Sequence, residues 1–292
     1  METNQDDFSN PWKKELNDLV RGASGGFLFG IPLIYTMEVW WIGSSVSPVR
    51  MLLALILTFA IVFMLNRTDG FRRTGNTDTR NVLMDSVESF AIGLVCTGIV
   101  LVLLREITLT TPLTEALGKL IYESVPFTLG IALANQFLGG DDEQSNSRNG
   151  SAQPVGQQTN ASATLSDIGA TLIGATIIAF NIAPTDEVPM LAAAVSEPWL
   201  LAVMLASLVI SYAIVFVAGF ANQPKRQQQQ GIFQRPISET IVSYLVSLLA
   251  AMVMLVFFDK LGWEDPWQMW LDHIVILGLP ATIGGAAGRL AI

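Results

Sequence analysis

Cysteine and histidine are almost missing from this 292-residue sequence, in which Cys96 and His273 are the single examples. One cysteine cannot form a disulfide within the chain. Zinc sites and paired-histidine haem sites need more ligands than these two residues provide. Dinucleotide-binding, phosphate-loop, nucleophile-elbow and zinc-protease motifs are missing as well. We therefore expect no cofactor, no metal centre and no enzyme activity.

Charged residues are also scarce, at 14% of the sequence, where soluble domains average about a quarter. The net charge of −9 argues against nucleic-acid binding, because that function needs concentrated lysine and arginine. Hydrophobic residues make up 51%, and the mean hydropathy is +0.48. This composition indicates that the lipid bilayer is the main partner of the chain.

The hydrophobic residues form blocks of about 20, the length that a helix needs to cross a hydrocarbon core of roughly 30 Å. The blocks are continuous and lack the alternating pattern of barrel strands, which favours helices. The sequence thus predicts an all-α polytopic membrane protein with about eight transmembrane helices, at residues 22–43, 48–66, 82–104, 113–137, 166–183, 198–221, 237–258 and 267–288.

Lysine, arginine and tryptophan predict the orientation of these helices, because basic residues stay on the cytoplasmic side and tryptophan prefers membrane interfaces. Connections on one side contain most of the basic residues, and those on the other side contain only Arg50, Arg105 and Lys260. Both termini are therefore predicted to be cytoplasmic. Six of the seven tryptophans then fall at the outer boundary: Trp40, Trp41, Trp199, Trp263, Trp267 and Trp270.

Stretches of polar residues divide the chain into transmembrane regions and segments outside the membrane. Residues 139–165 contain too few apolar side chains to fold, which predicts a flexible cytoplasmic linker. Residues 1–21 are predicted to be a cytoplasmic N-terminal segment. Two four-helix transmembrane regions then cover residues 22–138 and 166–292.

The two regions are similar in sequence. A shift of 154 positions superposes Asp85 on Glu239 and Pro126 on Pro280 without a gap. Aligned acids and prolines are hard to obtain by chance in apolar helices. A four-helix unit also returns to the side of the membrane where it began, so a copy keeps its orientation. The sequence therefore predicts a 4+4 parallel tandem repeat.

Ionisable residues within membrane spans often mark pathways, proton relays or ion pairs. Glu123 lies about ten residues into its predicted helix, hence about 15 Å deep and near the midplane. Lys119 and Glu115 precede it at four-residue intervals, so all three share one helical face. They could form a stabilising ion-pair ladder, or a charged lining in which Glu123 exchanges a proton or binds a cation.

Three further acids, Asp85, Glu88 and Glu239, lie near the predicted cytoplasmic ends of two helices. One interpretation is that they are first-turn acids, which the helix dipole and neighbouring arginines favour. The other interpretation places Asp85 and Glu239 face to face, as an acidic ring of the kind that cation pathways use.

On the predicted outer side, Glu38 either snorkels towards water or pairs with another helix. Asp272 and His273 occupy the outer third of the last helix, where His273 either senses protons or is simply hydrogen bonded. A membrane enzyme that acts on lipid would need acids at this interface, and Glu38, Glu106 and Asp272 are the only candidates in the sequence.

Pro126 and Pro280 are predicted helix kinks, since each removes a backbone hydrogen bond and frees a carbonyl oxygen. A membrane tolerates such a kink where another helix or a cavity satisfies that oxygen. The kinks could be hinges, ion-coordinating backbone, or packing adaptations alone. Glycine clusters in the first and last helices predict close helix packing.

Together these features favour a transporter or channel that conducts a small cation or is linked to protons. The alternative is a non-transporting membrane scaffold or sensor that buried ion pairs hold together. Each hypothesis assigns a different role to the charged side chains within the spans.

The stretch WKKELNDLVRGASGGFLFGIPLIYTMEVWW, residues 12–41, resembles the opening of an uncharacterised bacterial family of integral membrane proteins. Its Arg-Gly and Thr-Met-Glu-Val-Trp-Trp motifs carry the resemblance, which extends over most of the spans. The resemblance implies a multi-pass protein of the bacterial cytoplasmic membrane. It assigns no catalytic or binding residues.

Overall fold

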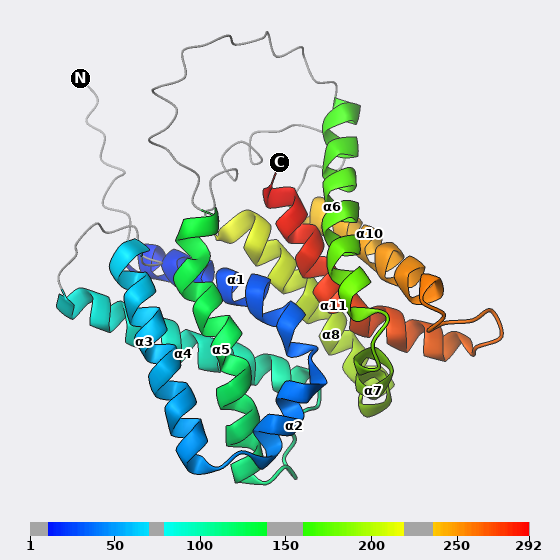
Figure 1. Ribbon diagram of the computed structural model, residues 1–292. Helices are drawn as coiled ribbons and strands as arrows, with labels where there is room; N and C mark the ends of the chain where they lie inside the picture. The colour runs from blue at the N-terminus through cyan, green and yellow to red at the C-terminus, as the bar shows by residue number, and fades with distance from the viewer. Residues whose placement is uncertain (1–10, 70–78, 139–159, 219–235, 292) are drawn as a thin grey trace, which may run out of the picture.

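Helices make up every element in the part of the chain that the computed structural model describes, residues 11–69, 79–138, 160–218 and 236–291 (Figure 1). The predicted all-α class is therefore confirmed. In chain order the elements are α1 (Pro11–Ile34), α2 (Met37–Ser45), α3 (Pro48–Asp69), α4 (Thr79–Leu103), α5 (Leu113–Leu138), α6 (Asn160–Ile182), α7 (Glu187–Ala194), α8 (Glu197–Tyr212), the π-helix η2 (Ala213–Val217), α10 (Pro236–Phe257) and α11 (Trp267–Leu290).

The described helices account for the predicted membrane spans. Seven of them are long and apolar enough to cross a membrane, with α8 and η2 counted as one. The bent pair of α1 and α2 raises the number to eight if it forms a single span. The short helix α7 lies between two of these spans and was not predicted.

The first span differs from the straight helix that its hydrophobicity predicts. Residues 22–43 are divided between α1 and α2, and the chain bends by 89° between the two helices. Pro32 weakens the last turn of α1, because proline has no amide hydrogen. The indole Nε1 of Trp40 then donates to the carbonyl oxygen of Ile34 at 2.7 Å, which satisfies the open helix end. A hydropathy pattern does not reveal this break, because both pieces are apolar.

Two segment boundaries also differ from the expected ones. Helix α1 begins at Pro11, so residues 11–21 of the predicted N-terminal segment are helical. Helix α6 begins at Asn160 and includes the last residues of the predicted linker. The rest of that linker, residues 139–159, lies outside the described residues, as do residues 1–10.

The two halves of the chain share one order of elements. In each half a long helix is followed by a short one and then by three long helices, with α8 and η2 again counted as one. Figure 1 shows α3, α4 and α5 on the left of the view and α6, α10 and α11 on the right. Helix α5 packs on α1, α3 and α4, and α11 packs on the matching α6, α8 and α10. This correspondence supports the predicted duplication, which stays a prediction about ancestry.

The turns at the ends of α4 and α10 match in detail. Each contains a residue with positive φ, Arg105 at 64° and Asp259 at 58°, and the two are 154 positions apart as the sequence alignment predicts. In both turns the next amide donates to the carbonyl oxygen five residues earlier, at 2.9 Å. These are the features of a Schellman motif, which terminates a helix and satisfies its last carbonyl groups.

Side chains also join the two halves at both ends of the helices. On the side that is predicted to be cytoplasmic, here called the terminal side, Nε of Arg21 donates to the carbonyl oxygen of Ala218, directly after η2, at 2.9 Å. On the opposite side, Nε1 of Trp199 donates to the carbonyl oxygen of Leu103 at 2.7 Å. The Arg105 guanidinium lies over the same indole ring, 5.3 Å from its centroid. Tryptophans expected at the membrane boundary therefore also satisfy helix ends.

Tyr35 joins the halves at a defect that a proline creates. Pro280 lies inside α11 and cannot donate a hydrogen bond to the carbonyl oxygen of Ile276, four residues earlier. The buried hydroxyl of Tyr35 donates to that oxygen at 2.6 Å. A side chain from the turn between α1 and α2 therefore satisfies the carbonyl oxygen that Pro280 is predicted to free.

Replacing Tyr35 with phenylalanine should lower the free energy of unfolding by about 1–2 kcal/mol, because the Ile276 carbonyl oxygen would be buried without a donor. Thermal unfolding in detergent measures the change. Pro280→Ala returns a backbone amide to this position, so Tyr35→Phe should destabilise the protein less in that background. Equal effects in both backgrounds would show that the hydroxyl does not compensate for the proline.

Candidate functional site

Glu123 is buried in α5, with 1% of its surface exposed, and its Oε1 atom has no hydrogen-bond partner among the described residues. Helices α1 and α5 run antiparallel, with Gly26 and Gly30 of α1 both against Phe127. One turn beyond Gly30 is Ile34, and one turn before Phe127 is Glu123, so this register brings the two level. The carboxyl group predicted near the midplane therefore lies beside the break between α1 and α2.

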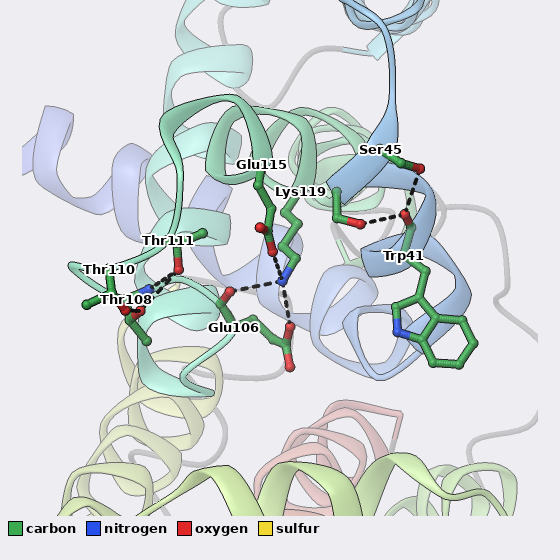
Figure 2. A network of polar contacts seen from close by, with 9 residues as sticks. Trp41, Ser45, Glu106, Thr108, Thr110, Thr111, Glu115 and Lys119 are labelled. Atoms are coloured by element: carbon green, nitrogen blue, oxygen red, sulfur yellow. Dashed lines mark hydrogen bonds and ion pairs between the residues drawn. The ribbon is translucent and has the colours of Figure 1, made fainter.

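Lys119 pairs with two other acids (Figure 2). Its Nζ atom lies 3.0 Å from Oε1 of Glu115 and 3.1 Å from Oε2 of Glu106, and it also donates to the Glu106 carbonyl oxygen at 3.2 Å. The i,i+4 neighbours Lys119 and Glu115 thus meet as the sequence pattern suggests. Glu106 comes from the loop between α4 and α5 and was not expected here. With two acids already on Lys119, the described structure gives it no ion pair or hydrogen bond to Glu123.

Pro126 lies about one turn after Glu123 on α5. It lies inside α5 and removes the amide that would bond to the carbonyl oxygen of Tyr122. In the second half the matching carbonyl is bonded by Tyr35, but the residue 149 positions after Tyr35 is Pro184, which has no hydroxyl. The two kinks are therefore not equivalent. A carboxyl group and backbone oxygens together are the ligand types that small hard cations prefer.

Glu187, the first residue of α7, belongs to the same region and was missed by the sequence analysis. It is 6% exposed, and its Oε1 atom accepts a long hydrogen bond, 3.5 Å, from the amide of Met37 at the start of α2. Its Oε2 atom is buried without a partner among the described residues. A signal was available, because residues 36–39 (TMEV) match residues 185–188 (TDEV) at a shift of 149 positions. Glu187 of the second half thus places a buried carboxyl group against α2, in the broken first span.

Glu239 takes part in a buried ion pair near the terminal side. Its Oε1 atom lies 3.2 Å from Nη1 of Arg289, whose Nη2 donates to Oγ of Ser211 at 3.1 Å. The arginine is completely buried. Asp85 and Glu88 are half-buried on α4, which packs mainly on helices of the first half, whereas α10 packs on helices of the second. The acidic ring of Asp85 and Glu239 remains a prediction.

The predicted outer candidates occupy different environments. Glu38 is exposed on α2, in contrast to its buried counterpart Glu187. Asp272 is half-buried and His273 is buried, and both line a pocket between α7 and α11. Sequence reasoning therefore located Glu38, Asp272 and His273, but their different exposure follows from how the helices pack.

Comparison with known proteins supports a membrane location. Searches of curated proteins and of solved structures found no match. The family described as "Putative integral membrane protein (DUF2391)" matches residues 18–292, which covers all the candidate spans beyond the first turns of α1. Since this match extends over most of the chain, the protein belongs to the DUF2391 family of putative integral membrane proteins.

Proposed function

We propose that this protein is a transporter or channel that conducts a small cation or is linked to protons, and that Glu123 is the group that takes up the cation or proton. The observation that carries the proposal is the burial of Glu123 in a membrane-spanning helix with an oxygen that lacks a partner in the described structure.

The charges around Glu123 favour a positive occupant. A buried carboxylate without a partner is unfavourable by several kcal/mol, so such a group is stable only with a bound proton or a cation. Lys119 does not fill this role, because Glu106 and Glu115 both lie within about 3 Å of its Nζ atom. Two acids on one lysine leave this cluster of Glu106, Glu115 and Lys119 with a net negative charge.

The break between α1 and α2 is a second feature of the proposed pathway. Glu123 lies level with the end of α1, and Glu187 contacts the start of α2. Known transporters use broken helices in this way, because the open backbone groups and helix ends interact with ions. Two buried carboxyl groups from different halves would then serve one route through the membrane.

Reconstituted protein should therefore move protons or a small cation across liposome membranes. Glu123→Gln should slow the flux by about tenfold or more, since an amide neither takes up a proton nor balances a cation. Pyranine fluorescence follows protons, and ion-sensitive dyes follow Na⁺ and K⁺. Glu264→Gln is a matched control, because Glu264 is exposed and the substitution removes the same charge. Equal flux for wild type and Glu123→Gln would overturn the assignment of this residue.

The second candidate is a membrane scaffold without transport. The buried pair of Arg289 and Glu239 and the cluster around Lys119 favour it, because both hold helices together. The liposome assay separates the two functions. A scaffold would give no flux of protons, Na⁺ or K⁺ above that of empty vesicles, and this result would overturn the proposed transport.

A further inference from the structure

An open pocket of about 310 Å³ lies between α7 and the beginning of α11. This volume falls at the lower end of the range for ligand pockets, so the pocket suits a small molecule. Most of its wall is apolar, from prolines, alanines and a methionine, and polar groups come from α11 alone. The lining residues are Pro189, Ala192, Ala193, Pro266, Gln268, Met269, Asp272 and His273.

Two residues that line this pocket each have a buried polar atom without a partner in the described structure. His273 is 5% exposed, and its Nδ1 atom is buried without a hydrogen bond. Oδ1 of Asp272 is buried and equally unbonded. A carboxylate oxygen accepts hydrogen bonds, and so does the unprotonated nitrogen of a neutral imidazole. A ligand that donates hydrogen bonds would satisfy both atoms once the two side chains turn towards the pocket, and burying them without a partner is otherwise unfavourable.

The charge around the pocket is negative. Asp272 lies within electrostatic range of Glu197, and His273 lies within range of Asp265. Glu197 also accepts a hydrogen bond from Gln268 of the pocket wall. These surroundings favour a cation over an anion or a neutral molecule.

The matching helix contact in the first half is tight. There α2 lies directly on α5, and a Cβ atom added to Gly43 would come within 2.9 Å of the Lys119 Cα atom. In the second half Ala192 takes the place of Gly43, 149 positions later, and Asp272 takes the place of Gly118, 154 positions later. Larger side chains thus stand where the first half has glycines at the contact. The contact between α7 and α11 is therefore less close than the matching contact between α2 and α5.

We propose that this pocket binds a small organic ammonium ion, whose N–H groups donate to Asp272 and His273 while its hydrocarbon part lies against the apolar wall. The ion could be a free amine or the ethanolamine headgroup of a lipid, since both present the same chemistry. Exposed Trp267 lies in sequence between the lining residues Pro266 and Gln268, at the depth where tryptophan meets lipid headgroups. This proposal does not depend on transport by Glu123.

Calorimetric titration of the purified protein in detergent tests the proposal with n-butylammonium, n-butanol and butyrate as probes of similar size. We expect n-butylammonium to bind and the neutral and anionic probes to bind much more weakly. Asp272→Asn should weaken n-butylammonium binding by about ten- to hundredfold, the range for one charge-assisted hydrogen bond. Glu264→Gln removes an exposed charge from the same region and should leave the affinity unchanged.

Two further measurements identify the occupant and guard against misfolding. Ala193→Phe adds bulk at an exposed wall of the pocket, so it should abolish binding while the melting temperature stays near that of wild type. Short-chain phosphatidylethanolamine should compete with n-butylammonium if a headgroup is the natural occupant, whereas a free amine is indicated if it does not. Equal binding of n-butanol and n-butylammonium, or equal losses in Asp272→Asn and Glu264→Gln, would overturn the proposal, as would no binding of n-butylammonium.

Discussion

Replacing Arg289 with methionine should lower the free energy of unfolding by about 3–5 kcal/mol, because it removes a buried cation that pairs with the buried Glu239 carboxylate. The arginine is completely buried and holds three helices, through Glu239 of α10, Ser211 of α8 and its own α11. Unfolding in sodium dodecyl sulfate, followed by circular dichroism, measures the loss. A change of about 1 kcal/mol or less would show that the pair contributes little.

A matched control and a double variant separate charge from packing. Arg50→Met removes an exposed arginine of α3 and should change stability little. Arg289→Met combined with Glu239→Leu removes both charges, and an apolar pair of similar volume is often as stable as a buried ion pair. The double variant should therefore recover much of the stability that Arg289→Met loses. Loss of stability equal to the sum of the two single variants would contradict the pairing.

Replacing Gly284 with alanine should destabilise the protein by about 3 kcal/mol, the upper range for overpacking. An added Cβ atom would lie 2.5 Å from the carbonyl oxygen of Gly174 and 2.5 Å from Cγ1 of Ile178 on α6. The carbonyl belongs to the backbone, so relief requires α6 and α11 to move apart. Small residues allow this close helix contact in a membrane, where no hydrophobic effect drives the helices together.

Two glycines provide the comparison for this prediction. Gly169 lies on α6 with nothing within 4 Å of its added Cβ atom, so Gly169→Ala should be neutral or slightly stabilising. Gly130 of α5 is the counterpart of Gly284, and its added Cβ atom would lie 2.6 Å from the Gly25 carbonyl oxygen. Gly130→Ala should therefore be about as harmful as Gly284→Ala. Melting temperatures in detergent distinguish the three variants, and similar values for Gly169→Ala and Gly284→Ala would refute the close contact.

Much of the fold follows from local properties of the sequence. A span needs about 20 apolar residues in a row, and a helix pairs every backbone group within the span, so each span can be recognised from its own residues. The spacing of Lys119 and Glu115 likewise suggested an ion pair that the structure contains. The turns that end α4 and α10 have their positive-φ residues, Arg105 and Asp259, at the spacing of the predicted repeat, and such turns also depend mainly on nearby residues.

The break between α1 and α2 depends both on local sequence and on tertiary contacts. Pro32 is visible in the sequence, but a proline inside an apolar run predicts only a kink of unknown size. The bend of 89° is stabilised by Trp40 on Ile34 and by Tyr35 on the opposite half. The Trp40 bond is local to the first half, but the Tyr35 bond forms only when the two halves pack, so hydropathy alone predicted one unbroken helix.

The sequence by itself determined the helical class, the approximate spans and the charged residues within them, because the bilayer imposes span length and internal hydrogen bonding on each segment separately. Only the tertiary structure decided which charges have partners. Lys119 meets Glu106, Glu239 meets Arg289 and Glu123 retains an unbonded oxygen, because residues far apart in the chain become neighbours through helix packing. The pocket beside His273 arises in the same way, from two helices that larger side chains keep apart.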